Sequence, residues 1–169
     1  IEAPTSEATR PTTDMVREAV FNALGSLDVV QGARVLDLFA GTGAMGIEAL
    51  SRGAAHCVFV ENDRAALAVL RSNIAALGIS EKSTVIAGDA VGTAAHQQEI
   101  DLLIADPPYG FDAWAGLLAS VTAPLVVLES GRPIGPIAGF ETVREKKYGR
   151  THVAFLSPSS APEGTVEVQ

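Results

Sequence analysis

The sequence is poor in cysteine and histidine and has no long apolar run, and each shortage excludes a class of protein. Cys57 has no partner for an internal disulfide, so a reducing cytoplasmic location is expected, and its apolar neighbours at 58–60 predict a small buried thiol. His56, His96 and His152 lack the spacing of metal ligands, so no metal site is predicted. No apolar run approaches the roughly 20 residues that cross a bilayer, and no secretory signal opens the chain. A soluble protein without a membrane partner is therefore expected.

Positive charge is also scarce, because 12 Lys and Arg residues stand against 20 Asp and Glu and give a formal net charge of -8. A free-standing, sequence-independent nucleic-acid binder needs clustered cations for its phosphate contacts, so the composition argues against that class. Net charge does not exclude local patches, and the chain starts at Ile1 without an initiator Met, so a basic segment could precede it. The length of 169 residues, with 47% hydrophobic residues, predicts one domain, which we expect to be monomeric.

Apolar periodicity predicts an alternation of strands and helices. Val16, Val20 and Leu24 recur at helical spacing, with N-cap candidates before them and Gly25 after them, and predict a first helix from about residue 11. The strands expected after it are 34–38, 56–61, 84–87, 101–105 and 124–129. One expected helix follows the first strand and ends near residue 52, and two others cover 64–77 and 113–121. Such an alternation implies parallel βαβ units with helices on both faces of the sheet.

The last part of the chain has a different pattern. A Gly/Pro-rich stretch at 130–136 precedes strand-like runs at 140–146 and 151–156, whose short link, Tyr148-Gly149-Arg150, permits only antiparallel pairing. We therefore expect a Rossmann-like α/β fold with a seven-stranded, mostly parallel sheet and a C-terminal hairpin that places one antiparallel strand at its edge. The expected organisation is a loose segment at 1–10, a folded domain at 11–156 and a weakly ordered tail at 157–169.

A glycine-rich turn, 40–46, follows the first expected strand and lets the backbone approach a ligand closely, with a helix N-terminus beyond it. Glu61 follows Gly41 by 20 residues, at the end of the next strand, where a carboxylate can bind ribose hydroxyls. An NAD-dependent dehydrogenase has the same spacing, and the glycines could merely permit a tight turn. Asp37 favours S-adenosylmethionine, because a carboxylate beside the loop would repel a pyrophosphate but attract the amino group of a methionine moiety.

The string Asp37-Leu38-Phe39-Ala40-Gly41-Thr42-Gly43 resembles motif I of the class I methyltransferases. The resemblance implies S-adenosylmethionine as the cofactor, with Glu61 on its ribose and Asp89 and Ala90 along its adenine. An Asp in a turn is also a common local cap, which is the alternative role for Asp89. The expected cofactor-binding residues are Asp37, Phe39, Gly41, Gly43, Glu61, Asn62, Asp89 and Ala90.

A second motif, Asp106-Pro107-Pro108-Tyr109, ends the apolar strand before it. Open α/β sheets bind ligands at the carboxyl ends of strands near the switch in strand order, which would lie here between the first and fourth strands. If the Asp106 carboxylate and the Pro107 carbonyl accept the two N–H bonds of an aromatic amine, its lone pair can face the cofactor methyl. Tyr109 would then stack on a base that has left its helix. The alternative is a Pro-Pro turn with a tyrosine packed on the surface.

Together the two motifs resemble those of the amino-methyltransferases of nucleic acids. The strings at 10–22 and 46–54 further resemble the bacterial small-subunit ribosomal RNA guanine-N2 methyltransferases of the D type, and the likeness runs to about Leu156. It implies methyl transfer to the N2 amine of a guanine in 16S rRNA, within an assembled or partly assembled small subunit. It also implies catalytic roles for Asp106, Pro107 and Tyr109 and substrate contacts for Arg10, Thr12, Pro108 and Tyr109.

Members of that family usually begin with a basic segment that includes a β-hairpin, and none stands before Ile1, so weak RNA binding by this chain alone is expected. The remaining cationic candidates are Arg10, Arg17, Arg144, Lys146, Lys147 and Arg150. A solvated strand face would explain the last four equally well. A capped helix start would explain Arg10, Thr12 and Thr13 equally well.

Three other functions remain open. A DNA adenine or cytosine amino-methyltransferase usually carries a target-recognition insertion, and none interrupts this compact chain. A nicotinamide-dependent oxidoreductase is disfavoured by Asp37 and by the Asp106-Pro107-Pro108-Tyr109 segment. A catalytically silent domain that binds nucleotide-like ligands is disfavoured because Asp106 and Tyr109 are both present.

Overall fold

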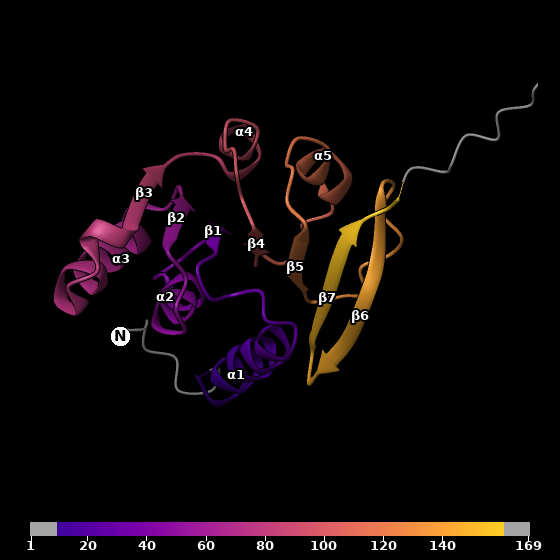
Figure 1. The fold of residues 1–169 in the computed structure, drawn as a ribbon, viewed down its shortest axis with the longest axis horizontal. Helices are drawn as coiled ribbons and strands as arrows, with labels where there is room; N and C mark the ends of the chain where they lie inside the picture. The colour runs from indigo at the N-terminus through magenta and orange to yellow at the C-terminus, as the bar shows by residue number, and fades with distance from the viewer. Residues whose placement is uncertain (1–9, 161–169) are drawn as a thin grey trace, which may run out of the picture.

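The computed structural model describes residues 10–160, with side chains from residue 13 onward, and is built on a seven-stranded sheet (Figure 1). The strands are β1 (Arg34–Leu38), β2 (His56–Glu61), β3 (Ser83–Ala87), β4 (Leu102–Ala105), β5 (Leu125–Ser130), β6 (Phe140–Tyr148) and β7 (Thr151–Pro158). The helices are α1 (Arg10–Ser26), α2 (Ala44–Ser51), α3 (Arg64–Leu77), α4 (Ala90–Ala94) and α5 (Trp114–Ala119), and a 3₁₀ turn, η1, covers Ser80–Lys82.

The strand order is β3-β2-β1-β4-β5-β7-β6, and β1 to β5 are mutually parallel. This confirms the expected α/β fold and the switch in strand order between β1 and β4. The strand that runs antiparallel to the others is β7, which lies between β5 and the outermost strand, β6. The antiparallel strand is therefore second from the edge of the sheet, and the hairpin as a whole forms the edge.

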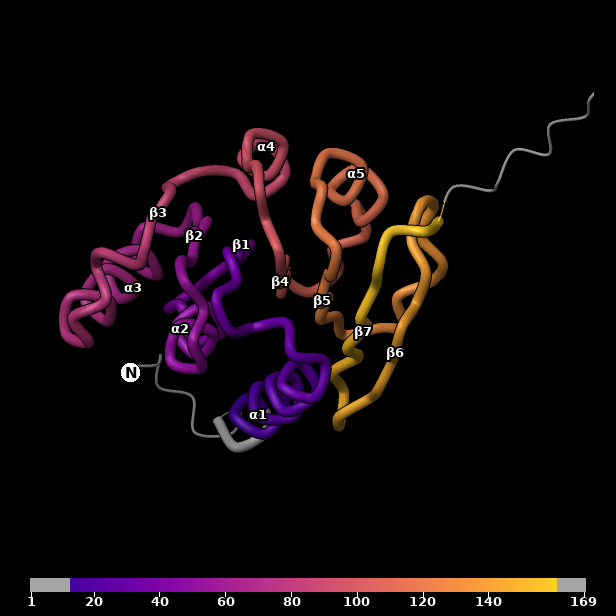
Figure 2. The backbone as a smooth tube through the Cα atoms, viewed as in Figure 1, coloured from indigo at the N-terminus to yellow at the C-terminus, as the bar shows by residue number. Residues whose placement is uncertain are grey.

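The helices cover both faces of the sheet, as Figures 1 and 2 show. Side chains alternate between the faces along each strand. One core packs α1, α2 and α3 against alternate strand residues such as Val35, Phe59 and Phe155. The other packs α4 and α5 against the intervening residues, including Leu36 and Leu128. Both faces are buried, which explains why the central strands are apolar throughout.

Local sequence signals explain where the elements begin and end. Asp63 caps α3, because its carboxylate accepts a hydrogen bond from the Ala66 N–H at 2.8 Å, and Gly78 ends that helix in the left-handed region at φ +67°. Cys57 is fully buried, which confirms the expected buried thiol. Both hairpin strands are two residues longer than expected, because β6 continues to Tyr148, which pairs with Thr151, and β7 continues to Pro158, which pairs with Phe140. Across residues 10–160, no helix combines the length and the apolar character needed to span a membrane.

Candidate active site

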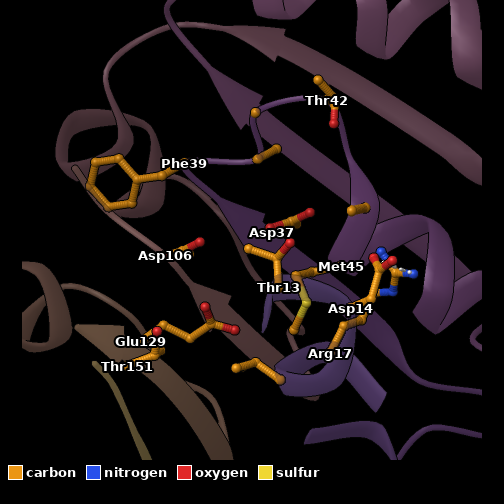
Figure 3. Close-up of a pocket in the computed structure, with 14 residues that line it drawn as sticks. Thr13, Asp14, Arg17, Asp37, Phe39, Thr42, Met45, Asp106, Glu129 and Thr151 are labelled. Carbon is orange, nitrogen blue, oxygen red and sulfur yellow. Dashed lines mark ion pairs between the residues drawn. The ribbon is translucent and has the colours of Figure 1, made fainter. Parts of the chain in front are cut away.

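A cavity of about 600 Å³ opens at the carboxyl ends of β1, β4 and β5, beside the switch in strand order (Figure 3). Its size is typical of a small-molecule site. It is lined by Thr13, Asp14, Val16, Arg17, Asp37, Phe39, Ala40, Gly41, Thr42, Ala44, Met45, Asp106, Glu129 and Thr151. The cavity therefore joins three of the predicted cofactor residues, Asp37, Phe39 and Gly41, to the predicted catalytic residue Asp106.

The glycine-rich turn is held by Glu61, at the end of β2. One carboxylate oxygen of Glu61 accepts the Gly41 N–H at 2.7 Å, and the other accepts the Asn62 and Asp63 N–H groups at 3.0 Å. Phe39 and Gly41 have positive φ values of 57° and 58°, which is the sharp turn that the sequence predicted. Glu61 lies outside the residues that line the cavity, but it fixes the loop that does line it.

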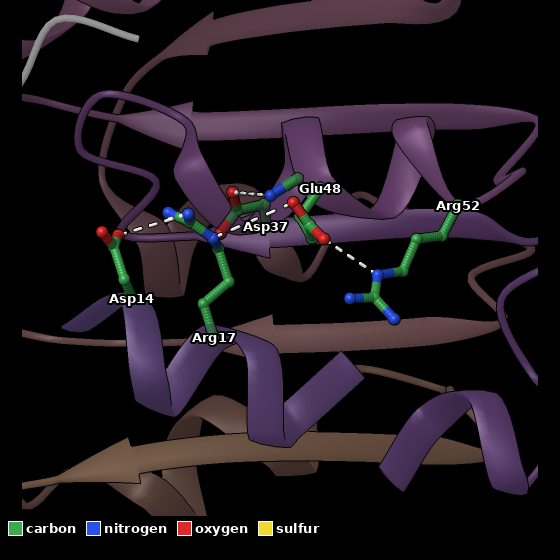
Figure 4. A network of polar contacts seen from close by, with 6 residues as sticks. Asp14, Arg17, Asp37, Glu48 and Arg52 are labelled. Carbon is green, nitrogen blue, oxygen red and sulfur yellow. Dashed lines mark hydrogen bonds and ion pairs between the residues drawn. The ribbon is translucent and has the colours of Figure 1, made fainter. Parts of the chain in front are cut away.

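Asp37 is a buried acid at the end of β1. Its carboxylate accepts the Gly46 N–H at 3.0 Å from α2 (Figure 4). Burial raises the pKa of Asp37 to about 7; the hydrogen bond from Gly46 opposes this rise, and the nearby charges of Asp106 and Glu61 add to it. A cation in the cavity would shift this equilibrium toward the ionised carboxylate.

Glu129 is a site residue that the sequence interpretation did not identify. It is buried at the end of β5, and the pairing of Ala105 with Leu128 makes Asp106 and Glu129 the next residues on neighbouring parallel strands. The two acids share a side-chain hydrogen bond. Burial raises the pKa of Glu129 to about 8, and the charge of Asp106, the hydrogen bond between the two side chains and the charge of Asp37 raise it further, which favours a protonated Glu129 that donates a hydrogen bond to the Asp106 carboxylate. Desolvation also raises the pKa of Asp106.

Three carboxyl groups therefore face one cavity, since Asp37, Asp106 and Glu129 end the adjacent strands β1, β4 and β5 (Figure 3). The negative charge of Asp106 and of ionised Asp37, beside a protonated Glu129, opposes a phosphate or pyrophosphate and favours a cationic ligand. A signal for Glu129 was present in the sequence, because an acidic residue ends an apolar strand at this position as at Asp37. Only the strand order reveals that the two acids share a site.

The rest of the Asp106-Pro107-Pro108-Tyr109 segment lies outside the lining of the cavity. The Tyr109 side chain is 94% exposed and lies over Gly131, where an added Cβ would be 3.0 Å from two ring carbons. The Arg132 guanidinium donates to the Gly110 carbonyl at 3.1 Å and ties this loop to the segment after β5. Tyr109 is thus a free aromatic ring beside the site, and its stacking on a base stays a prediction.

Three predicted cofactor residues lie just after β2 and β3 and outside the cavity lining, namely Asn62, Asp89 and Ala90. Asp89 caps α4 by accepting the Gly92 N–H at 2.8 Å, so the local role that the sequence left open is the one seen here. Ala90 is buried and Asn62 is exposed.

Gly43 is also absent from the lining of the cavity; its φ is 91°, and a side chain there would collide with Leu70 of α3. Arg10 and Thr12 belong to α1, but their side chains lie outside the described residues.

Ion pairs join α1 to α2 along one wall of the cavity (Figure 4). Arg17 pairs with Asp14 at 3.2 Å and approaches Glu48 at 3.9 Å. Glu48 also pairs with Arg52 at 2.8 Å. Arg17 and Asp14 both line the cavity, so this network lies at the contact between the first helix and α2.

Comparisons with known proteins identify relatives in sequence and in fold. The model of a family described as "Conserved hypothetical protein 95" matches residues 1–157. A Bacillus subtilis protein named "Putative rRNA methyltransferase YlbH" is 34% identical over 169 residues, which cover 92% of this chain and 91% of that protein. The Escherichia coli protein named "Ribosomal RNA small subunit methyltransferase D" is 39% identical over 109 residues, or 64% of this chain and 54% of that protein. A solved Streptococcus pyogenes structure titled as a conserved hypothetical protein has a TM-score of 0.76 and 32% identity, and the match covers 85% of this chain and 95% of that one.

Proposed function

Because the chain belongs to the family described as conserved hypothetical protein 95, we propose that it is an S-adenosylmethionine-dependent methyltransferase of small-subunit ribosomal RNA, and that its target is the N2 amine of a guanine in 16S rRNA. One observation carries the proposal. The glycine-rich turn and three carboxyl groups share a single cavity at the switch in strand order.

The residues of the cavity fit S-adenosylmethionine better than a dinucleotide. The cofactor carries no phosphate, and its sulfonium and amino groups are positive, so ionised Asp37 and Asp106 favour it and oppose a pyrophosphate. Asp37 would face the methionine amino group, Gly41 and its neighbours would approach the cofactor with their backbone, and Glu61 would hold the ribose. When bound, the cofactor supplies a methyl group activated for nucleophilic attack.

The chemistry that this chain's residues would add concerns the acceptor amine. An amine on an aromatic ring is a poor nucleophile because its lone pair is delocalised into the ring. Hydrogen bonds from its two N–H groups to the Asp106 carboxylate and the Pro107 carbonyl would favour a pyramidal nitrogen with its lone pair free. The acceptor nitrogen would gain positive charge as it takes up the methyl group and would then release one proton to water, with S-adenosylhomocysteine as the other product. The Asp106 carboxylate would stabilise that charge, and the Glu129 hydrogen bond would fix its orientation.

The test is methyl transfer to small ribosomal subunits from a bacterial strain that lacks the modification. Labelled S-adenosylmethionine supplies the methyl group, and mass spectrometry of the digested RNA identifies the product nucleoside. We expect N2-methylguanosine at one position, and no product with Asp106→Ala. Methylation of another nucleoside would remove the guanine-N2 assignment, and the absence of any transfer by the wild-type chain would remove the function.

A further inference from the structure

The turn between β6 and β7 lies at the same end of the sheet as the cavity. Thr151, the first residue of β7, lines the cavity, and His152 pairs with Ser130 at the end of β5. On the other side of β7, Lys147 pairs with His152 and Tyr148 pairs with Thr151. Tyr148 also packs on the core that contains α1, and Figure 1 shows the turn next to that helix. The end of the hairpin is therefore a flank of the proposed active site.

This flank carries a concentration of positive charge, although the chain as a whole has a formal net charge of -8. The four cations are exposed, and we call them the basic hairpin patch; they are Arg144, Lys146, Lys147 and Arg150. Among residues 10–160, the ion pairs involve Arg17 and Arg52 and none of these four. The patch is therefore not neutralised by the protein itself, even though Glu141 and Glu145 lie on the same strand.

The pairing register places the charges on defined faces of the hairpin. Arg144 pairs with Phe155 and Lys146 with Val153, and both partners belong to the core that contains α1. Residues that pair across neighbouring strands point to the same face, so these two cations share the α1 side of the sheet. Glu145 pairs with Ala154, which belongs to the opposite core, so its carboxylate lies on the other face. The α1 side therefore has two cations with no acidic residue between them, whereas Lys147, which pairs with His152, lies on the same face as Glu145.

We propose that the basic hairpin patch binds the phosphate backbone of the RNA whose base enters the cavity, an inference that rests on the function proposed above. Ionised Asp37 and Asp106 make the cavity unfavourable for phosphate, so cations outside it would hold the RNA backbone. Lys147 and Ser130 are two strand positions apart through His152, which amounts to about 10 Å. The patch would therefore contact the backbone of nucleotides that flank the target base.

The experiment compares two triple variants that remove the same charge. Lys146→Gln, Lys147→Gln and Arg150→Gln neutralise the hairpin end, whereas Arg64→Gln, Arg71→Gln and Lys82→Gln neutralise three exposed cations near β3, at the opposite edge of the sheet. Binding to unmodified small subunits and to their protein-free RNA is measured across a salt series. S-adenosylhomocysteine affinity and thermal stability are measured in parallel, because neither depends on the patch.

The hairpin variant should bind both probes about tenfold more weakly than wild type, and its slope of log affinity against log salt should be smaller by about 2, since each phosphate contact on a single strand contributes about 0.7. Its KM for subunits should rise while kcat stays near the wild-type value, and the β3 variant should resemble wild type. Lys146→Arg, Lys147→Arg and Arg150→Lys together keep the charges and should keep the affinity.

Equal RNA affinities and salt slopes for the two triple variants would overturn the proposal. So would weaker binding to subunits with unchanged binding to protein-free RNA, because the patch would then contact a ribosomal protein. The failure of the proposed function would look different, since the wild-type chain would then bind the RNA in a patch-dependent manner but transfer no methyl group.

Discussion

Asp37 is a buried acid whose pKa of about 7 makes its charge sensitive to pH in the physiological range. The proposed cofactor is a cation, so it should bind the ionised carboxylate. Affinity for S-adenosylmethionine should therefore rise on the order of tenfold between pH 6 and pH 8, as the ionised fraction increases. Isothermal titration calorimetry across this range measures it. Asp37→Asn should flatten the pH profile and weaken binding at pH 8 by about 1.5–3 kcal/mol. A wild-type profile as flat as that of the variant would show that Asp37 does not contact the cation.

Asp106 differs from Asp37 because we assign it to the acceptor amine. Asp106→Asn keeps the shape and one acceptor oxygen but removes the negative charge that would stabilise the developing positive nitrogen. Single-turnover methyl transfer should slow by about 10²–10³-fold, the usual effect of losing one such electrostatic contact. Cofactor affinity should change far less than the transfer rate, because the Asp106 charge acts mainly on the nitrogen that becomes positive in the transition state. Wild-type transfer rates in this variant would contradict the assignment.

At the scale of elements, the contact between α2 and the ends of β1 and β2 shapes the site. Gly46 lies within α2, and a Cβ there would be 2.6 Å from the Cys57 Sγ and 2.9 Å from an Asp37 carboxylate oxygen. Gly46→Ala should therefore lower the free energy of unfolding by about 1–3 kcal/mol, as overpacking of a core does. It should also weaken cofactor binding, because Asp37 or the turn must move.

The matched control for Gly46→Ala is Gly116→Ala in α5. A Cβ at Gly116 would meet no atom within 4 Å. This substitution should raise the free energy of unfolding by about 0.5–1 kcal/mol, because alanine restricts the unfolded chain and favours a helix. Urea denaturation of both variants gives the two values. If both variants were stabilised, α2 would not pack on Asp37 as closely as described.

The elements were predictable from the sequence because their signals are local. Apolar runs flanked by glycines and caps gave β1, β2 and α3 their bounds, and the motifs at 37–43 and 106–109 identified the two sides of the cavity. Glu129 could not be identified in this way. Its chemistry depends on the adjacency of β4 and β5 and on burial, neither of which is encoded in the residues around it. The position of the Tyr109 ring over Gly131 likewise involves a residue distant in the sequence.

For the whole molecule, buried acids link global stability to pH. The pKa of Glu129 rises on folding from 4.5 to about 8, so the native state holds a proton that the unfolded chain releases in this range. The free energy of unfolding should therefore fall as pH rises from about 4.5 through 8. Glu129→Gln removes the ionisable group, so the free energy of unfolding of this variant should decrease less between pH 5 and pH 8.5 than that of wild type.

Chemical denaturation at the two pH values measures this effect. Glu141→Gln, at an exposed position on β6, is the matched control and should change stability equally at pH 5 and pH 8.5. If Glu129→Gln and Glu141→Gln showed the same pH dependence as wild type, Glu129 would be ionised in the native protein and would not donate to Asp106.

The pairing of β1 with β4 also affects the order in which the molecule can fold. The Arg34 N–H donates to the Asp101 carboxylate across 67 positions in the sequence, and Asp37 and Asp106 meet only after β4 has docked beside β1. Contacts between residues so far apart in the chain are slow to form, since a long loop must close first. The segment up to α3 can form its local helix and turn earlier, but it has only one wall of the cavity. Cofactor binding would thus report completed folding, and a growing chain would have no methyl-transfer site until its second half had been made.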